Sequence, residues 1–238
     1  MGRDGAKLEP GDLDMATTAV SLRRGDATRE RLLDAAEALL AGHGFNSPSH
    51  RNLAGHAGVH VALVNYHFGS KELLFEETLA RRASRLADEW RRELLAARSK
   101  RSVMVEDIVR AYWAPFDGVD RGDDARWRNY LCVVARVADA PEGEAWHQRH
   151  FGEVLAEFRA ALHVTLPGIS KDDLDSGFRY VRRMLDTVLL HRCGKTGGTC
   201  VPKGFRIEDV ERMIAFLGAG MRRLSLNHVP HRFPAEVT

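Results

Sequence analysis

One segment of the chain, residues 49–68, has the pattern of two short helices joined by a tight turn. Ser49 favours a helix start, because its side-chain oxygen can accept a hydrogen bond from a backbone N–H of the first turn. Gly58 suits a left-handed turn between the helices. This pattern predicts a helix-turn-helix with helices over roughly 50–57 and 60–66. The apolar residues expected to bury against a third helix are Leu53, Val59 and Val64.

This segment also lies in a stretch without acidic side chains. No Asp or Glu occurs between Glu37 and Glu72, whereas Arg51 and Lys71 are present. The same stretch contains five histidines, which are His43, His50, His56, His60 and His67. A surface free of acids can approach the phosphates of DNA without charge repulsion. Because two formal positive charges are few, we expect one copy to bind weakly and the protein to act as a dimer.

The remaining sequence predicts an all-α protein. Leu32, Leu33, Ala36, Leu39 and Leu40 recur at steps of three and four residues, the period of an amphipathic helix. We expect this helix to begin near residue 26 and a long connecting helix to cover 70–98. No segment shows the alternation of apolar and polar residues that is typical of a β-strand. Further helices are predicted near 102–118, 123–139, 143–165, 171–192 and 206–225.

The predicted organisation is a small N-terminal helix-turn-helix domain followed by a larger helical bundle. Residues 1–25 have no apolar period and are expected to be disordered. The DNA-binding domain is predicted over 26–70 and the ligand-binding and dimerisation domain over 71–228. Residues 229–238 would form a C-terminal tail.

Several motifs in the first third of the chain resemble the TetR family of one-component repressors. The resemblance covers Ala27 to about Leu79 and is most specific in its last part. The motifs are Thr28-Arg29-Glu30-Arg31-Leu32-Leu33-Asp34-Ala35-Ala36, His43-Gly44-Phe45, Leu53-Ala54, Ala57-Gly58-Val59 and the run from Val64 to Phe75. The resemblance implies a transcriptional regulator, usually a repressor, that binds a near-palindromic operator on double-stranded DNA as a homodimer and is released by a small-molecule inducer.

The resemblance also implies which side chains contact DNA. Base edges would be read by residues 60–63, and the backbone would be contacted by residues 65–67. Lys71 would pair with a phosphate at a helix N-terminus. Where the family commonly has a small polar residue, this chain has His60, and Leu63 replaces a Thr or Ala, so the reading surface is mostly apolar and favours thymine methyls. The full set is Ser49, His50, Arg51, His60, Val61, Ala62, Leu63, Asn65, Tyr66, His67 and Lys71.

Aromatic side chains gather between residues 112 and 158. In a helical bundle such residues build core, but together they could line an apolar pocket. The family implies an inducer in this domain, and Arg128, Arg136, His147 or Arg183 could meet an acidic head group. We therefore expect a largely apolar or acidic inducer. The candidate ligand-binding residues are Trp113, Phe116, Trp127, Tyr130, Trp146, His147, Phe151 and Met184.

The last two long helices are the candidates for a dimer interface. Each has an apolar stripe, and Gly218 and Gly220 would permit close approach of helices. Two such pairs meeting about a two-fold axis would form a four-helix interface, although the stripes could also be intrachain core. The candidate residues are Phe178, Val181, Leu185, Val188, Val210, Met213, Phe216, Leu217 and Met221.

Other functional classes have weaker support. The sequence has no nucleophile elbow, no HExxH and no paired carboxylates at a defined spacing, so no catalytic residue, metal site or cofactor is predicted. Cys193 and Cys200 fit no common zinc spacing and could form a redox pair. We expect a cytoplasmic protein, because no export signal or membrane-length apolar stretch is present. The alternatives are a helix-turn-helix adaptor that acts through protein contacts and, with least support, a helical enzyme.

Overall fold

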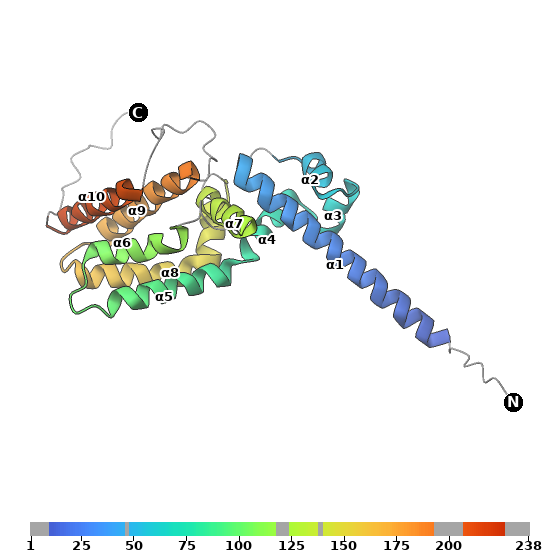
Figure 1. Cartoon of the computed structure of the whole chain (residues 1–238), viewed down its shortest axis with the longest axis horizontal. Coiled ribbons are helices and arrows are strands. Elements are labelled where there is room, and N and C mark those ends of the chain that lie inside the picture. The colour runs from blue at the N-terminus through green and yellow to red at the C-terminus, as the bar shows by residue number, and fades with distance from the viewer. Residues whose placement is uncertain (1–9, 46–47, 118–123, 138–139, 193–206, 227–238) are drawn as a thin grey trace, which may run out of the picture.

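The computed structural model describes residues 10–45, 48–117, 124–137, 140–192 and 207–226. The described residues form helices and no strand, which confirms the all-α prediction. Figure 1 shows α2 and α3 against α1 at one end and a larger group of helices at the other. The elements are α1 (Pro10–His43), α2 (His50–Ala57), α3 (Ala62–Phe68), α4 (Lys71–Ala80), α5 (Ala83–Arg98), α6 (Val105–Trp113), η1 (Ala114–Phe116), α7 (Ala125–Arg136), α8 (Gly143–Thr165), α9 (Lys171–Arg192) and α10 (Ile207–Leu226).

The first helix is longer than predicted. We expected a disordered segment through residue 25, but α1 begins at Pro10, and its N-terminal half extends past α2 and α3 (Figure 1). Proline is well tolerated in the first turn of a helix, because its missing N–H would have no intrahelical partner there. Gly25 lies inside the helix without a break, and a Cβ added to it would meet no neighbouring atom within 4 Å. The expected helix start near residue 26 is therefore wrong.

The core of the N-terminal helices forms where α1, α2 and α3 meet. Leu32, Ala36 and Leu40 present one buried face of α1, as the helical period predicts. Leu53 and Val64 are completely buried against this face. Val59 is half-buried and packs on the same core. The three-helix arrangement therefore rests on the apolar positions identified from the sequence.

The long connecting helix is interrupted. A continuous helix over 70–98 is predicted, but α4 ends at Ala80 and α5 begins at Ala83. At the break, the Arg81 guanidinium lies 2.6 Å from Asp34 of α1. Arg82 Nε lies 3.2 Å from the buried Glu37 carboxylate, also on α1. These ion pairs hold the junction on α1, while α5 packs against α6 and α8.

The two ends of the molecule are joined at the C-terminus of α1. Helix α7 packs along α1, and the Arg136 side chain donates a hydrogen bond from Nε to the Ala41 carbonyl at 3.2 Å. Phe45, just past α1, packs against Trp146 of α8 with ring centroids 5.7 Å apart. Movement of α7 or α8 would therefore act directly on the helix that supports α2 and α3. The predicted domain division at residue 70 stays a prediction.

The larger group of helices has a closely packed aromatic core. Trp90 of α5 stacks on Tyr112 of α6 at 5.0 Å and meets Phe151 of α8 edge-on at 5.4 Å. Its indole N–H donates to the Tyr112 carbonyl at 2.8 Å. In the described part of the chain, no helix is long and apolar enough to span a bilayer.

Candidate functional site

The turn between α2 and α3 has the predicted geometry. Gly58 ends α2 at φ 63° and ψ 39°, a left-handed conformation that favours glycine. Ser49 begins the same helix, and its hydroxyl accepts a hydrogen bond from Asn52 N at 3.2 Å. The Val59 N–H then donates to the Ala54 carbonyl at 3.0 Å and closes the turn. The predicted cap, turn residue and bounds of the first short helix are confirmed.

Arg31 of α1 holds this turn in place. Its guanidinium donates to the carbonyl oxygens of Ala57 and Gly58 at 2.6 and 2.9 Å. These carbonyls lie at the C-terminus of α2, where a positive charge is favoured by the helix dipole. This role of Arg31 was not predicted from the sequence, because an arginine on the polar side of an amphipathic helix resembles any solvated residue.

The predicted DNA contacts gather on the outer side of α2 and α3. Arg51 is exposed and has no ion-pair partner among the described residues. Tyr66 is 80% exposed, far more than an aromatic side chain in a core, and Val61 is 43% exposed. Ser49, His60, Ala62 and Asn65 are also exposed, whereas His50, Leu63, His67 and Lys71 are half-buried.

His60 has a different place from the one predicted. The second short helix begins at Ala62 and runs to Phe68, two residues later than expected at each end. His60 therefore precedes the helix, and its Nδ1 accepts a hydrogen bond from the Ala62 N–H at 3.3 Å. That bond uses the lone pair of Nδ1, so Nδ1 is not available to accept a hydrogen bond from a base. His60 therefore lies outside α3, whose N-cap is Val61, and its Nδ1 is occupied by a backbone N–H.

Lys71 stands at the N-terminus of α4, as predicted. Ser70 is the N-cap, and its hydroxyl accepts a hydrogen bond from Leu73 N at 3.2 Å. The Lys71 ammonium lies 5.6 Å from the centre of the Phe75 ring. This position combines a cationic side chain with the positive end of a helix, an arrangement suited to a phosphate.

The predicted ligand-binding aromatics are mostly core or junction residues. Phe116 and Phe151 are buried around Trp90. Tyr130 donates its hydroxyl to the Leu79 carbonyl at the end of α4, at 2.7 Å. Trp127 stacks on Tyr130 and lies under the Arg85 guanidinium. Trp146 packs on Phe45, and Met184 is 39% exposed on α9. One pocket lined by all of these residues stays a prediction, and most of their rings contact other side chains of the bundle.

His147 belongs to a buried polar contact instead of an open pocket. An Arg182 guanidinium nitrogen lies 3.0 Å from its Nδ1. Burial lowers the pKa of His147 well below its usual range, and the positive charges of Arg182 and Arg183 act in the same direction. The imidazole is therefore neutral at physiological pH. Arg182 was not among the predicted residues, although its neighbour Arg183 was.

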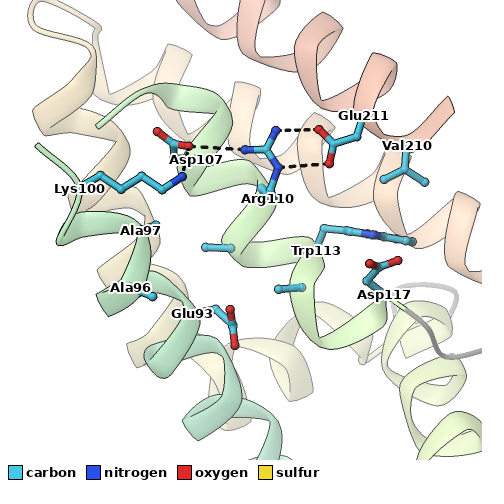
Figure 2. Close-up of a pocket in the computed structure, with 12 residues that line it drawn as sticks. Glu93, Ala96, Ala97, Lys100, Asp107, Arg110, Trp113, Asp117, Val210 and Glu211 are labelled. Carbon is cyan, nitrogen blue, oxygen red and sulfur yellow. Dashed lines mark hydrogen bonds and ion pairs between the residues drawn. The ribbon is translucent and has the colours of Figure 1, made fainter. Parts of the chain in front are cut away.

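A cavity of about 470 Å³ lies between α5, α6 and α10 (Figure 2). Of the predicted ligand-binding residues, Trp113 lines it. The other lining residues are Glu93, Ala96, Ala97, Lys100, Asp107, Arg110, Ala111, Ala114, Asp117, Val210 and Glu211. They were missed because small and charged residues on amphipathic helices have no sequence pattern that distinguishes a cavity from a solvated surface.

Comparison with known families agrees with the helix-turn-helix geometry. Residues 32–78 match the profile described as bacterial regulatory proteins of the tetR family. Residues 110–220 match the profile of the tetracyclin repressor-like C-terminal domain. The chain belongs to the TetR family. This family consists of DNA-binding regulators of transcription and not of enzymes.

Solved structures resemble this TetR-family protein over most of its length. A TetR-like transcriptional regulator from Rhodococcus sp. RHA1 has a TM-score of 0.50 and 18% identity, covering 84% of this chain and 97% of the other. A second regulator from Rhodococcus sp. Rha1 has a TM-score of 0.49 and 21% identity, covering 82% and 96%. A TetR-family regulator from Marinobacter aquaeolei VT8 has a TM-score of 0.49 and 20% identity, covering 83% and 97%. The first likeness supports the shared fold alone. A search of curated proteins gave no significant match.

Most predicted dimer residues of the TetR-family protein face its own core. The exceptions are Met213, which is half-buried, and Phe216, which is 68% exposed. A Cβ on Gly218 would lie 2.4 Å from the Glu106 carboxylate. The lack of a side chain at Gly218 therefore leaves space for the Glu106 side chain of α6. The buried residues are Phe178, Val181, Leu185, Val188, Val210, Leu217 and Met221. Their assignment to a dimer interface stays a prediction, and within one chain they are covered by intrachain packing.

The three cysteines divide between the bundle core and a segment outside the described residues. Cys193 and Cys200, the candidate redox pair, lie in that segment. Cys132 is buried in α7, as expected for a core residue. No group of metal-ligating side chains occurs within the residues that the structure describes.

Proposed function

We propose that this TetR-family regulator is a repressor that binds a near-palindromic operator as a homodimer and is released by a small molecule. The observation that carries the proposal is the acid-free outer side of α2 and α3. Arg51 and Tyr66 are exposed there, and Lys71 lies at the adjoining end of α4. A helix-turn-helix surface of this kind can enter the major groove while cationic groups approach phosphates.

We infer a dimer because the predicted DNA-contacting surface of one copy carries few positive charges. Arg51 and Lys71 are its formal cations, and each phosphate contact adds a limited, salt-dependent contribution to affinity. A second copy doubles these contacts and requires two half-sites about one helical turn apart or a multiple of it.

The outward sides of α9 and α10 are the proposed interface. Tyr180 is 63% exposed, Met184 lies one turn further along the same side of α9, and Phe216 is 68% exposed on α10. Large apolar side chains at helical spacing suit a contact between copies. This set replaces the buried stripes predicted from the sequence.

The release step is supported by the junction at the end of α1. Arg136 and Trp146 connect α7 and α8 to the end of the helix that supports the DNA-contacting surface. A ligand that binds one arrangement of these helices more tightly would shift the spacing of the two DNA-contacting surfaces in a dimer.

The test is operator binding by the full-length protein. Gel retardation on the DNA upstream of its own gene should give a complex with two protomers on a near-palindromic site. An isolated half-site should bind much more weakly. Equal affinity for random duplex and upstream DNA would contradict the regulator, whereas tight binding of one protomer to a half-site would contradict the dimer.

The second candidate is an adaptor that binds DNA without a ligand. The closely packed aromatic core around Trp90 favours it, because the Trp90 ring contacts Tyr112 and Phe151 directly. The cavity between α5, α6 and α10 favours a ligand-responsive regulator instead.

A further inference from the structure

The cavity between α5, α6 and α10 has an apolar surface built largely from small side chains. Its volume of about 470 Å³ falls in the range of small-molecule sites. Ala97 of α5 and Ala111 of α6 are buried and line it, and Trp113 and Val210 complete the apolar surface. Because an alanine side chain ends at Cβ, these positions leave space that larger side chains would fill. The apolar surface therefore suits the body of a small organic molecule.

Ion pairs fix two of the helices around this cavity. Arg110 of α6 donates to both carboxylate oxygens of Glu211 on α10, at 3.2 and 2.7 Å. Glu106, one turn earlier in α6, lies 2.6 Å from Arg222, which is further along α10. The separation of α6 and α10 is therefore held by specific contacts at two points as well as by packing.

The two cations of the cavity lining are paired with two of its carboxylates. Figure 2 shows a chain of polar contacts that runs from Lys100 through Asp107 and Arg110 to Glu211. Lys100 Nζ lies 2.7 Å from the Asp107 carboxylate. The hydrogen bonds between Arg110 and Glu211 raise the pKa of Arg110 and lower the pKa of Glu211, so both side chains remain charged. These four groups neutralise one another and leave no unpaired cation for an anionic ligand.

The other two carboxylates of the lining also have partners. Glu93 lies 3.5 Å from Arg92, and Asp117 has an interaction partner of its own. A charged ligand that enters such a site loses hydration without gaining an unpaired countercharge, whereas a neutral ligand does not carry this cost. The paired lining therefore favours a neutral ligand over an ion of either sign.

We propose that this cavity binds a small neutral molecule with an apolar body. The body covers Ala97, Ala111 and Trp113, and the paired side chains at the rim keep their partners when it is bound. This assignment rests on the proposed response to a small molecule. Of the apolar and acidic inducers expected from the sequence, it selects the apolar one and places it outside the predicted aromatic pocket.

A ligand in this cavity would contact two elements that the proposed function uses. Helix α5 follows the junction that Arg81 and Arg82 hold on α1. Helix α10 carries the exposed Phe216, which is proposed for the contact between copies. A molecule that binds one spacing of α5 and α10 more tightly than another shifts the population toward that spacing.

The test is isothermal titration calorimetry on the full-length protein. Benzyl alcohol is the neutral probe, and benzoate and benzyltrimethylammonium carry a similar apolar body with a negative or a positive charge. Benzyl alcohol should bind at least about fivefold more tightly than either ion, because only the ions lose hydration of a charge. Its affinity should also be the same at low and high salt, since a neutral ligand has no charge to screen. Equal or tighter binding of either ion, or no binding of benzyl alcohol, would overturn the proposal.

A pair of variants locates the site. Ala96 is exposed on α5 and lines the cavity, so Ala96→Phe should fill the space and abolish binding of benzyl alcohol. Ala160→Phe is the matched control, because Ala160 is an exposed alanine on α8 that does not line the cavity. Circular dichroism checks that both variants fold. Wild-type affinity in folded Ala96→Phe, or an equal loss in the control, would overturn the location.

Operator binding in the presence of saturating benzyl alcohol separates this inference from the proposed function. If benzyl alcohol binds as expected and operator affinity does not change, the cavity assignment stands and its role in release is contradicted. If a different compound releases the operator and benzyl alcohol does not bind, the proposed function stands and this assignment fails.

Discussion

At the residue scale, two arginines of the DNA-binding end have opposite roles that their sequence context does not reveal. Arg31 has an intramolecular role, because its guanidinium donates hydrogen bonds to the carbonyls at the end of α2. Arg51 is exposed and has no ion-pair partner within the described part of the chain. A cation held beside a turn stabilises the fold, whereas one left in solvent on an acid-free surface can bind an external anion.

We predict that Arg51→Ala weakens operator binding by about 1–3 kcal/mol if the guanidinium reads a base edge, and by less if it contacts a phosphate. The free energy of unfolding should change by less than about 0.5 kcal/mol, as for most exposed substitutions. Fluorescence anisotropy on operator DNA and urea unfolding measure the two quantities. Arg98→Ala, an exposed arginine at the far end of α5, is the control. Operator affinity equal to that of the control would rule out a role for Arg51.

We also predict that Arg31→Ala destabilises the protein by about 1–2 kcal/mol, because two carbonyls lose a charged donor. Urea unfolding gives this value directly. Operator affinity should fall as well, since the orientation of α3 depends on the turn that Arg31 holds. Unchanged stability would show that solvent replaces the guanidinium without cost.

At the element scale, the tight turn decides how α2 and α3 are arranged. Gly58 has φ 63°, and a Cβ there would lie 2.9 Å from the Arg31 guanidinium. Gly55, one turn earlier in α2, would have no atom within 4 Å of an added Cβ and has ordinary helical geometry. The turn conformation therefore requires glycine at position 58. At position 55, no described neighbour would clash with a larger residue, so glycine is not required there.

We predict opposite effects for the two alanine substitutions. Gly58→Ala should lower the free energy of unfolding by about 1–2 kcal/mol, because a left-handed conformation is strained with a side chain. Gly55→Ala should raise it by about 0.5–1 kcal/mol, because alanine reduces the entropy lost when the helix forms. Thermal and urea unfolding test both. Destabilisation by Gly55→Ala equal to that of Gly58→Ala would contradict the distinction.

At the scale of the whole molecule, the bundle contains an imidazole that stays neutral. His147 is 3% exposed, and Arg182, Arg183 and His150 are the positive or titratable groups that lower its pKa together with burial. The unfolded chain binds a proton at this residue near pH 6.5. Between pH 6.5 and the lowered pKa of the folded state, the unfolded chain therefore holds more protons, so stability falls as pH falls.

We predict that this residue contributes a slope of at most about 1.4 kcal/mol per pH unit below pH 6.5. His147→Gln keeps an acceptor for Arg182 and removes the titration. Urea unfolding between pH 7.5 and 5 should show that the stability of wild type falls more steeply than that of the variant. Parallel pH profiles would show that His147 does not remain neutral in the folded protein.

The amino-acid sequence alone determined the helix-turn-helix and the family, because caps, turn glycines and helical periods are local signals. Ser49 and Gly58 act within a few residues of their own positions, and the structure places them as predicted. The same reasoning failed at Arg81 and Arg82, where contacts to α1 interrupt a regular helical pattern.

Only the tertiary structure decided what each apolar stripe faces. Tyr130, Trp146 and Leu185 would show the same period whether they met a ligand, a second copy or their own core. Their neighbours come from distant helices, and here those neighbours bury them. The cavity arises for the converse reason, since alanines on two separate helices leave space only when the fold brings them together. Local chemistry thus specified the DNA-binding motif, and long-range packing specified the cavity between α5, α6 and α10.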